Sequence, residues 1–246
     1  MAKQVQMAYQ QAKKRLFLLD YDGTLVPFKS HPSLAKPTPA LLALLQKLAS
    51  DPRNHIVIIS GRDQLTLDAW LGQLPLSIVA EHGSFVRPVG QGWQAVAPRS
   101  DVWKHEVRPL LDAAASQVAA SFVEEKSTAL VWHYRLSTPQ AAAGQIAWLG
   151  PTLTQNAKKY HLLVLHGLKI LEVRIGNVTK GTAATTLLQQ QPWDFICAAG
   201  DDITDEDLFK ALPQDAYTFK IGSGVTAANT RLPSCGALIK LLHTLV

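Results

Sequence analysis

The chain has 246 residues, of which 47% are hydrophobic, and its formal net charge is +5. This length and composition are ordinary for a globular protein that buries a sizeable core. No apolar run reaches the roughly 18 residues that span a bilayer, and the first residues lack the apolar segment of a signal peptide. We therefore expect neither a membrane protein nor an exported one.

The two cysteines, Cys197 and Cys235, lie far apart in the sequence and form no CxxC pair. This spacing argues against a disulfide framework or a zinc site and favours the reducing cytoplasm. The positive net charge mildly favours an anionic partner. However, the Lys and Arg residues are scattered, and the cluster at residues 13–15 is explained more simply as a solvated surface. We expect no nucleic-acid partner.

The first third of the chain alternates between apolar runs and helical patterns. Apolar runs at residues 16–19, 55–59 and 76–80 predict short buried strands, because each stops at polar residues or glycine. Thr38 and Pro39 have the residue types of an N-cap and a first helical position, so a helix is predicted from there to about residue 49. A second helix is expected to end near residue 71. The alternation predicts a parallel sheet with right-handed crossovers.

The pattern changes in the middle of the chain and then returns. Residues 84–96 predict a hairpin, and an α+β block follows, with helices at about 101–120 and 138–160 and strands at 130–135, 162–165 and 169–173. Strands at 195–199 and 216–219 then alternate with helices at 180–190, 205–212 and 234–245. We predict a discontinuous α/β core, residues 1–99 and 169–246, with a small α+β domain inserted at 100–168.

Acidic or hydroxyl side chains follow three of the predicted parallel strands. They are Asp20 and Asp22 after the first strand, Ser60 after the second, and Asp201, Asp202 and Asp205 after the strand at 195–199. The carboxyl ends of parallel strands share one edge of a sheet, so these groups are expected to converge. Carboxylates so close repel one another unless a cation lies between them, and Mg²⁺ suits carboxylate ligands. The sequence therefore predicts a magnesium site.

Simpler interpretations exist for each motif taken alone. Asp22-Gly23 is a common turn dipeptide, and Ser60 next to Gly61 could cap the following helix. Lys180 could be an ordinary exposed lysine, although a lysine at the start of a helix can also neutralise a phosphate. Only the combination of these motifs favours a phosphate and metal site.

Four motifs occur in a fixed order: Asp-Tyr-Asp-Gly-Thr at 20–24, Ile-Ser-Gly-Arg at 59–62, Lys180-Gly181, and Gly-Asp-Asp-Ile-Thr-Asp-Glu-Asp at 200–207. Together they resemble the motifs of the haloacid dehalogenase superfamily of phosphatases. The resemblance implies a Rossmann-like core, in which helices flank a parallel sheet. The inserted block resembles the α/β cap of type C2 in that superfamily.

Further segments resemble the trehalose-6-phosphate phosphatase family. They are Ala-Glu-His-Gly at 80–83, His-Tyr-Arg at 133–135, Leu-Glu-Val-Arg at 171–174, and the fourth motif extended to residue 209. One departure is that Ile175 stands where the family usually has proline. The resemblance implies Mg²⁺-dependent hydrolysis of trehalose 6-phosphate to trehalose and phosphate, and a possible association with a trehalose-phosphate synthase. We expect a monomer.

The resemblance implies a role for each motif residue. Asp20 would be the nucleophile, and Asp22 the general acid and base. Ser60 and Lys180 would bind the phosphoryl oxygens. Mg²⁺ would be held by Asp20, the backbone carbonyl of Asp22, Asp201, and Asp205 as a ligand or as its support. Asp202 could orient Lys180.

A disaccharide also needs polar side chains around its hydroxyls. The residues expected to bind substrate are Gly61, Arg62, Glu81, His82, Gly83, Arg135, Lys169, Glu172, Arg174 and Asp202. Alternatives remain open: Glu172 and Arg174 could form an exposed ion pair, and His133 could face the interior. Trp93, Trp132 and Trp148 are more simply core residues than sugar platforms.

Other functions also remain open at this point. Within the superfamily, the chain could be a phosphatase for sucrose phosphate or mannosyl-3-phosphoglycerate, or a phosphohexomutase. From another class, it could be a non-catalytic sugar-phosphate sensor. A sensor would be expected to lack acids of the site, and every one of them is present.

Overall fold

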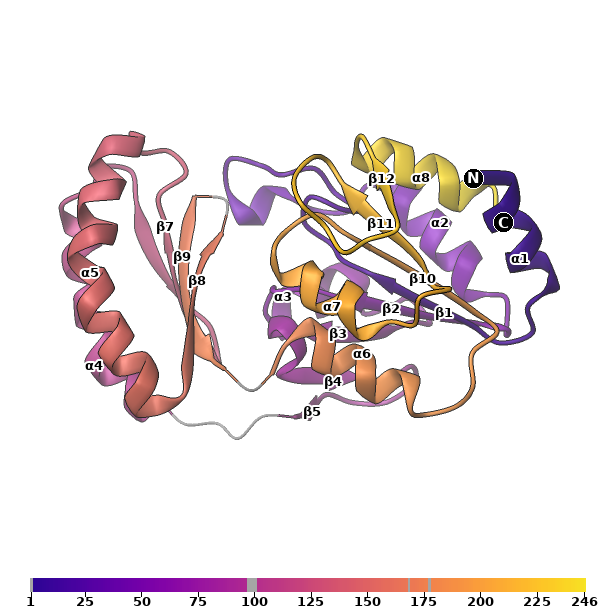
Figure 1. Cartoon of the computed structure of the whole chain (residues 1–246), viewed down its shortest axis with the longest axis horizontal. Coiled ribbons are helices and arrows are strands. Elements are labelled where there is room, and N and C mark those ends of the chain that lie inside the picture. The colour runs from indigo at the N-terminus through magenta and orange to yellow at the C-terminus, as the bar shows by residue number, and fades with distance from the viewer. Residues whose placement is uncertain (1, 97–100, 168, 177) are drawn as a thin grey trace. The chain divides into compact units, whose positions relative to one another are not determined.

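A computed structural model describes residues 2–96, 101–167, 169–176 and 178–246. The chain divides into two compact units, which we describe separately (Figure 1). The first unit comprises Met1–Val96 and Thr179–Val246, and the second comprises Ala97–Val178. Among the described residues, no helix is both long and apolar enough to cross a membrane.

The first unit is built on an eight-stranded sheet with the strand order β12-β11-β10-β1-β2-β3-β4-β5. The strands are β1 Arg15–Leu19, β2 Asn54–Ile59, β3 Ser77–Ala80, β4 Phe85–Arg87, β5 Gln94–Ala95, β10 Phe195–Gly200, β11 Tyr217–Ile221 and β12 Thr230–Leu232. All pairs from β12 to β3 are parallel, whereas β4 and β5 add an antiparallel edge. The predicted parallel sheet is confirmed.

Helices cover both faces of this sheet. They are α1 Ala2–Gln11, α2 Pro39–Ala49, α3 Gln64–Leu71, α6 Lys180–Leu188, α7 Thr204–Ala211 and α8 Cys235–His243, with short 3-10 turns η1 Pro32–Leu34 and η2 Glu81–Gly83. The predicted start of α2 is confirmed, because the Thr38 hydroxyl accepts the Leu41 backbone N–H at 3.2 Å. Capping of this kind satisfies an N–H that has no partner within the helix.

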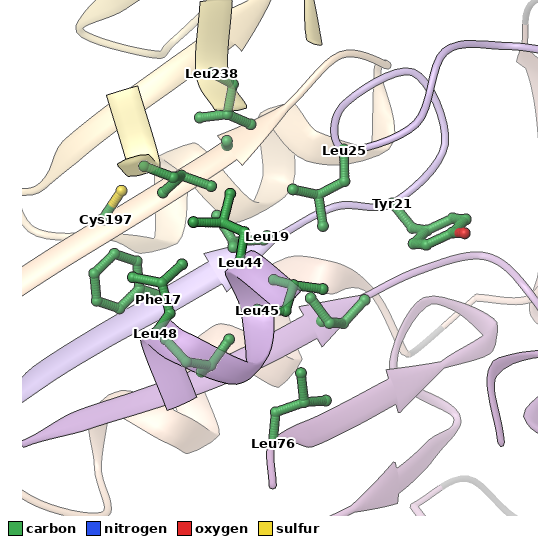
Figure 2. Packing of buried hydrophobic residues seen from close by; sticks show 14 of the residues in the cluster. Phe17, Leu19, Tyr21, Leu25, Leu44, Leu45, Leu48, Leu76, Cys197 and Leu238 are labelled. Atoms are coloured by element: carbon green, nitrogen blue, oxygen red, sulfur yellow. The ribbon is translucent and has the colours of Figure 1, made fainter. Parts of the chain in front are cut away.

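The central strand β1 shows why the sequences of the parallel strands are continuous apolar runs. Its residues alternate between two cores: Phe17 and Leu19 pack with α2 and α8, and Leu16 and Leu18 pack with α6 and α7. Figure 2 shows the first of these cores, where Phe17 and Leu19 lie among leucines of α2. A strand that is buried on both faces has no polar side to alternate with its apolar one.

The second unit is a four-stranded antiparallel sheet that packs against two helices. The strand order is β6-β7-β9-β8, with β6 Phe122–Glu125, β7 Ala129–His133, β8 Leu162–Gly167 and β9 Ile170–Ile175. Helices α4 Val102–Ser116 and α5 Pro139–Tyr160 contribute Trp103, Val107, Leu149 and Leu153 to a core that also holds Leu130 and Trp132 of β7. Trp132 is therefore a core residue.

One predicted boundary needs correction. The sequence predicts an insertion at residues 100–168, and residues 97–100 and 168 lie outside the described residues. Strand β9 pairs with β7 and β8, so the segment from 169 to 175 belongs to the second unit. The prediction places the return to the core about one strand too early, because the run at 169–173 resembles a core strand in composition. Helix α1 and strands β6 and β12 were not expected either.

Candidate active site

The loop after β1 carries the first pair of acids. Asp20 is 5% exposed, and its backbone N–H donates to the Ala199 carbonyl of β10 at 3.0 Å. The chain then turns at Gly23, whose φ of +82° is a left-handed conformation that favours glycine. A Cβ at this position would lie 2.3 Å from an oxygen of Asp201. Glycine therefore lets the Asp20 loop and the loop after β10 approach closely.

Lys180, the first residue of α6, joins these two loops. Its Nζ lies 2.6 Å from Oδ1 of Asp20 and 2.7 Å from Oδ1 of Asp205, and the side chain is 2% exposed. Burial alone would lower the pKa of Lys180. The negative charges of Asp20 and Asp205 together have the larger effect, so the pKa of Lys180 is raised. The alternative of an exposed lysine is therefore wrong.

Asp205 organises the loop after β10. Its Oδ2 accepts the backbone N–H groups of Asp201 and Asp202, at 2.9 and 3.0 Å. A Cβ on Gly200 would lie 2.2 Å from the Asp205 carboxyl carbon, so glycine makes room for this packing. Asp202 instead accepts from the Ile203 N–H at 2.8 Å. The prediction that Asp202 orients Lys180 is therefore corrected: Asp205 holds it.

Three carboxylates are close enough to share a cation. Asp20, Asp201 and Asp205 each offer an oxygen, and these oxygens all lie within 4.8 Å of one another. Burial, followed by the Asp205 charge, raises the pKa of Asp201 to about 7. Among the residues that the structure describes, the Lys180 ammonium is the one cation that pairs with these three acids, and such a donor set fits a divalent cation. Among the described residues, the side chain of Asp22 does not belong to this group of three carboxylates.

The Asp22 carboxylate binds Arg62 instead. The Arg62 Nε lies 2.6 Å from Oδ2 of Asp22, and its Nη2 lies 2.7 Å from Oδ1. The same Nη2 donates to the Pro32 carbonyl at 2.8 Å. A planar guanidinium thus holds both oxygens of the acid in a bidentate pair.

Ser60 directly follows β2 and is 1% exposed. Its hydroxyl accepts the Arg62 backbone N–H at 3.2 Å, and its carbonyl accepts the His82 N–H at 3.0 Å. Glu81 and His82 have φ values of 46° and 57°, and a Cβ on Gly61 would lie 2.4 Å from Nε2 of His82. The turn Glu81-His82-Gly83 therefore packs on the Ser60 loop, as the sheet order predicts.

The other predicted sugar ligands belong to the second unit. Glu172 and Arg174 lie two residues apart on β9 and are 4% and 3% exposed, which argues against an exposed ion pair. Lys169 is exposed with a φ of 59°, and Arg135 is half-buried. His133 binds Glu124 at 2.7 Å and stacks on Phe122.

Sequence reasoning missed three supports of the site. Thr24 donates its hydroxyl to Asp201 at 3.2 Å, and the buried Lys220 of β11 donates to the Asp202 carbonyl at 3.3 Å. Trp70 of α3 lies against Arg62, with the guanidinium carbon 4.4 Å from its ring centre. Thr24 belongs to the first motif but was given no role there, whereas Trp70 and Lys220 lie outside every motif and are brought to the site by α3 and β11.

The fold is that of the haloacid dehalogenase-like hydrolases. A solved structure from B. subtilis with that description aligns with a TM-score of 0.60, over 94% of this chain and 99% of the other, at 14% identity, which shows the fold alone. The family model for trehalose-phosphatase matches residues 18–232, so the chain belongs to the trehalose-phosphatase family.

Individual relatives agree with this assignment. The "Bifunctional trehalose-6-phosphate synthase/phosphatase" of Thermoproteus tenax is 41% identical over 237 residues, which are 96% of this chain and 32% of that protein. The C-terminal domain of C. albicans trehalose-6-phosphate phosphatase aligns with a TM-score of 0.93 at 31% identity, over 99% of this chain and 96% of that one. This chain spans about a third of the length of the curated relatives that it matches first.

Proposed function

We propose that this chain hydrolyses trehalose 6-phosphate to trehalose and phosphate. The observation that carries the proposal is the buried triangle of Lys180, Asp20 and Asp205 beside Asp201, in a member of the trehalose-phosphatase family. A lysine that touches a carboxylate at the end of the central strand can bind a phosphoryl oxygen next to that carboxylate.

Asp20 is the proposed nucleophile. Its carboxylate oxygen attacks phosphorus, the bond from phosphorus to the sugar oxygen breaks, and an aspartyl phosphate forms. Asp22 donates the proton that the departing sugar oxygen needs. Asp22 then takes a proton from water as that water attacks phosphorus, which releases phosphate and restores Asp20. Ser60 and Lys180 hold the phosphoryl oxygens in both steps.

Mg²⁺ is the proposed cation. Asp20, Asp201 and Asp205 would hold it together with the backbone carbonyl of Asp22, and when bound it would offset the repulsion between the nucleophile and the phosphate. The three carboxylates fit a divalent cation for two reasons. Their oxygens lie within 4.8 Å of one another, and their summed negative charge exceeds the positive charge of the lysine beside them.

Sugar-binding residues are proposed in each unit. In the first unit these are Gly61, Glu81, His82, Gly83 and Asp202, and in the second they are Arg135, Lys169, Glu172 and Arg174. A buried carboxylate and a buried guanidinium on one face of β9 can accept and donate hydrogen bonds to hydroxyls. The second unit would serve as the cap of the catalytic core.

We also propose a working context for the enzyme. Its substrate would be supplied by a trehalose-phosphate synthase, since a relative's name joins the two activities. We expect the chain to act as a monomer in the cytoplasm. The free thiols of Cys197 and Cys235 are compatible with a reducing compartment.

Phosphate release from a panel of sugar phosphates tests the proposal. With Mg²⁺ present, the ratio kcat/KM should be highest for trehalose 6-phosphate and lower for sucrose, glucose and mannose phosphates. Equal values across the panel would reduce the proposal to a general sugar phosphatase. Isomerisation without phosphate release would indicate a mutase instead.

A divalent cation should stabilise the fold even without substrate. Added to chelator-treated protein at about 100 times its Kd, Mg²⁺ should raise the free energy of unfolding by about 2.7 kcal/mol, seen as a higher melting temperature. Asp201→Asn should abolish the increase, whereas Asp194→Asn, at the amino end of β10, should keep it. An unchanged increase in Asp201→Asn would contradict the proposed metal site.

A further inference from the structure

Arg62 occupies an environment that differs from that of a substrate ligand. Its side chain is only 11% exposed, and both oxygens of Asp22 and the Pro32 carbonyl accept three of its five N–H groups. An arginine that waits for a phosphate or a sugar would present its donors to the open site. The fork of Arg62 is instead filled by a protein carboxylate.

Trp70 supports this arrangement from α3. The Arg62 guanidinium lies over its ring at 4.4 Å, a distance typical of a cation–π contact. Trp70 in turn packs against Tyr21, with ring centres 5.6 Å apart, and the Tyr21 hydroxyl donates to the Ala35 carbonyl at 2.8 Å. Tyr21 is fully buried and precedes Asp22 in the sequence. Arg62 therefore packs against a pair of aromatic rings, Trp70 and Tyr21, that support each other.

We propose that Arg62 and Trp70 are positioning residues that fix the Asp22 carboxylate for proton transfer, and that Arg62 does not bind substrate. The inference rests on the proposed function, because it concerns the acid and base of that reaction. Asp22 lies on a loop and is 28% exposed, so its side chain would otherwise sample several rotamers. A bidentate partner whose own position is fixed by an indole restricts that freedom.

Two substrates separate this role from phosphate binding. The sugar oxygen of trehalose 6-phosphate leaves as an alkoxide and needs a proton from Asp22. The nitrophenolate of p-nitrophenyl phosphate is a stable anion and leaves without one. The ratio kcat/KM covers the reaction only up to formation of the aspartyl phosphate. A defect in the position of Asp22 therefore lowers this ratio for the sugar ester and spares the aryl ester.

The test measures both substrates with four variants and two controls. Arg62→Ala should lower kcat/KM for trehalose 6-phosphate about 100-fold, through kcat and not KM, and Trp70→Ala about 10-fold. Both should change the value for p-nitrophenyl phosphate less than about 3-fold. Trp70→Phe should recover part of the loss. Arg62→Lys, which keeps the charge without the fork, should recover little.

The first unit offers matched controls. Arg87 pairs with Asp68 of α3 at 2.8 Å and its guanidinium lies 5.9 Å from the Trp93 ring, so Arg87→Ala and Trp93→Ala remove the same kinds of contact without involving Asp22. Both controls should leave the two ratios unchanged. Circular dichroism and the melting temperature establish that each variant is folded, and Trp70→Phe and Arg62→Lys retain most of the original packing.

Three results would overturn the inference or a part of it. Equal losses on both esters, or a raised KM with unchanged kcat in Arg62→Ala, would make Arg62 a phosphate or substrate ligand. Full activity of Trp70→Ala would show that Trp70 does not position Arg62 and Asp22. Failure of the proposed function looks different: the wild-type protein itself would then release phosphate from no sugar ester, whatever it does to the aryl ester.

Discussion

Replacing Asp20 by asparagine is expected to reduce turnover of trehalose 6-phosphate by at least about 10⁴-fold, because removing a nucleophile removes the covalent route. The fold should remain, since the amide has nearly the same size as the carboxylate. Lys180 keeps its contact with Asp205 at 2.7 Å. One charge fewer in a crowded acidic site should leave the melting temperature of the cation-free protein equal or higher.

The measurement is phosphate release together with thermal unfolding. Asp194→Asn is the matched control, since Asp194 accepts the backbone N–H groups of Lys13 and Lys14 away from the site. Normal turnover by Asp20→Asn would contradict its role as nucleophile. A large fall in its melting temperature would mean that the lost activity reports the fold and not the chemistry.

Replacing Lys180 by methionine should damage both activity and stability. The substitution leaves Asp20 and Asp205 buried beside Asp201 without their cation, and removing one partner of a buried ion pair costs about 3–5 kcal/mol. We expect a melting temperature lower by about 10 °C. Phosphate release should become undetectable, because the phosphoryl oxygens lose a positive partner.

The pH dependence shows whether charge is the cause. A carboxyl group whose pKa is raised in the folded state favours folding below its unfolded pKa and loses that contribution as pH rises through the folded value. Burial and Asp205 raise the pKa of Asp201 to about 7 even with Lys180 present. In chelator, Lys180→Met should therefore be destabilised more at pH 8 than at about pH 5.

A second substitution tests the same cause. Adding Asp205→Asn to Lys180→Met removes one of the unpaired charges and should recover part of the lost stability. Lys220→Met removes another buried lysine, whose contacts with Asp202 and Glu206 are longer at 3.3 and 3.4 Å, and should cost less. Equal losses in all three variants at both pH values would attribute the effect to packing.

The arrangement of the first unit could be predicted because its strands are fully buried. Residues such as Phe17 and Val57 lie in strands with helices on both sides, so they form continuous apolar runs that stop where the chain reaches the sheet edge. The polar groups at those edges must then converge. For this reason the meeting of Asp20 with Asp201 and Asp205 followed from sequence alone.

Features that depend on long-range pairing could not be predicted in the same way. Strand β9 has the composition of a core strand, and only its pairing with β7 and β8 assigns it to the second unit. Similarly, Asp202 and Asp205 both belong to the fourth motif, so the sequence alone does not show which of them contacts Lys180. The start of α7 turns Asp205 towards Lys180 and leaves Asp202 to accept a local N–H.

Arg62 shows the same limit at the scale of one side chain. Its position beside Ser60 and Gly61 suggested a substrate ligand. Its actual partners come from the loop after β1, the η1 turn and α3, which lie up to 40 residues away in sequence. A motif therefore indicates that a residue belongs to a site, whereas its partners in the fold indicate what it does there.

The stereochemical course at phosphorus distinguishes an aspartyl phosphate from direct attack by water. Trehalose 6-phosphate made as an isotopically chiral thiophosphate ester would be hydrolysed in labelled water, and the configuration of the released thiophosphate determined. Attack by Asp20 and then by water inverts phosphorus twice, so we predict net retention. Net inversion would mean direct attack by water and would contradict the aspartyl phosphate.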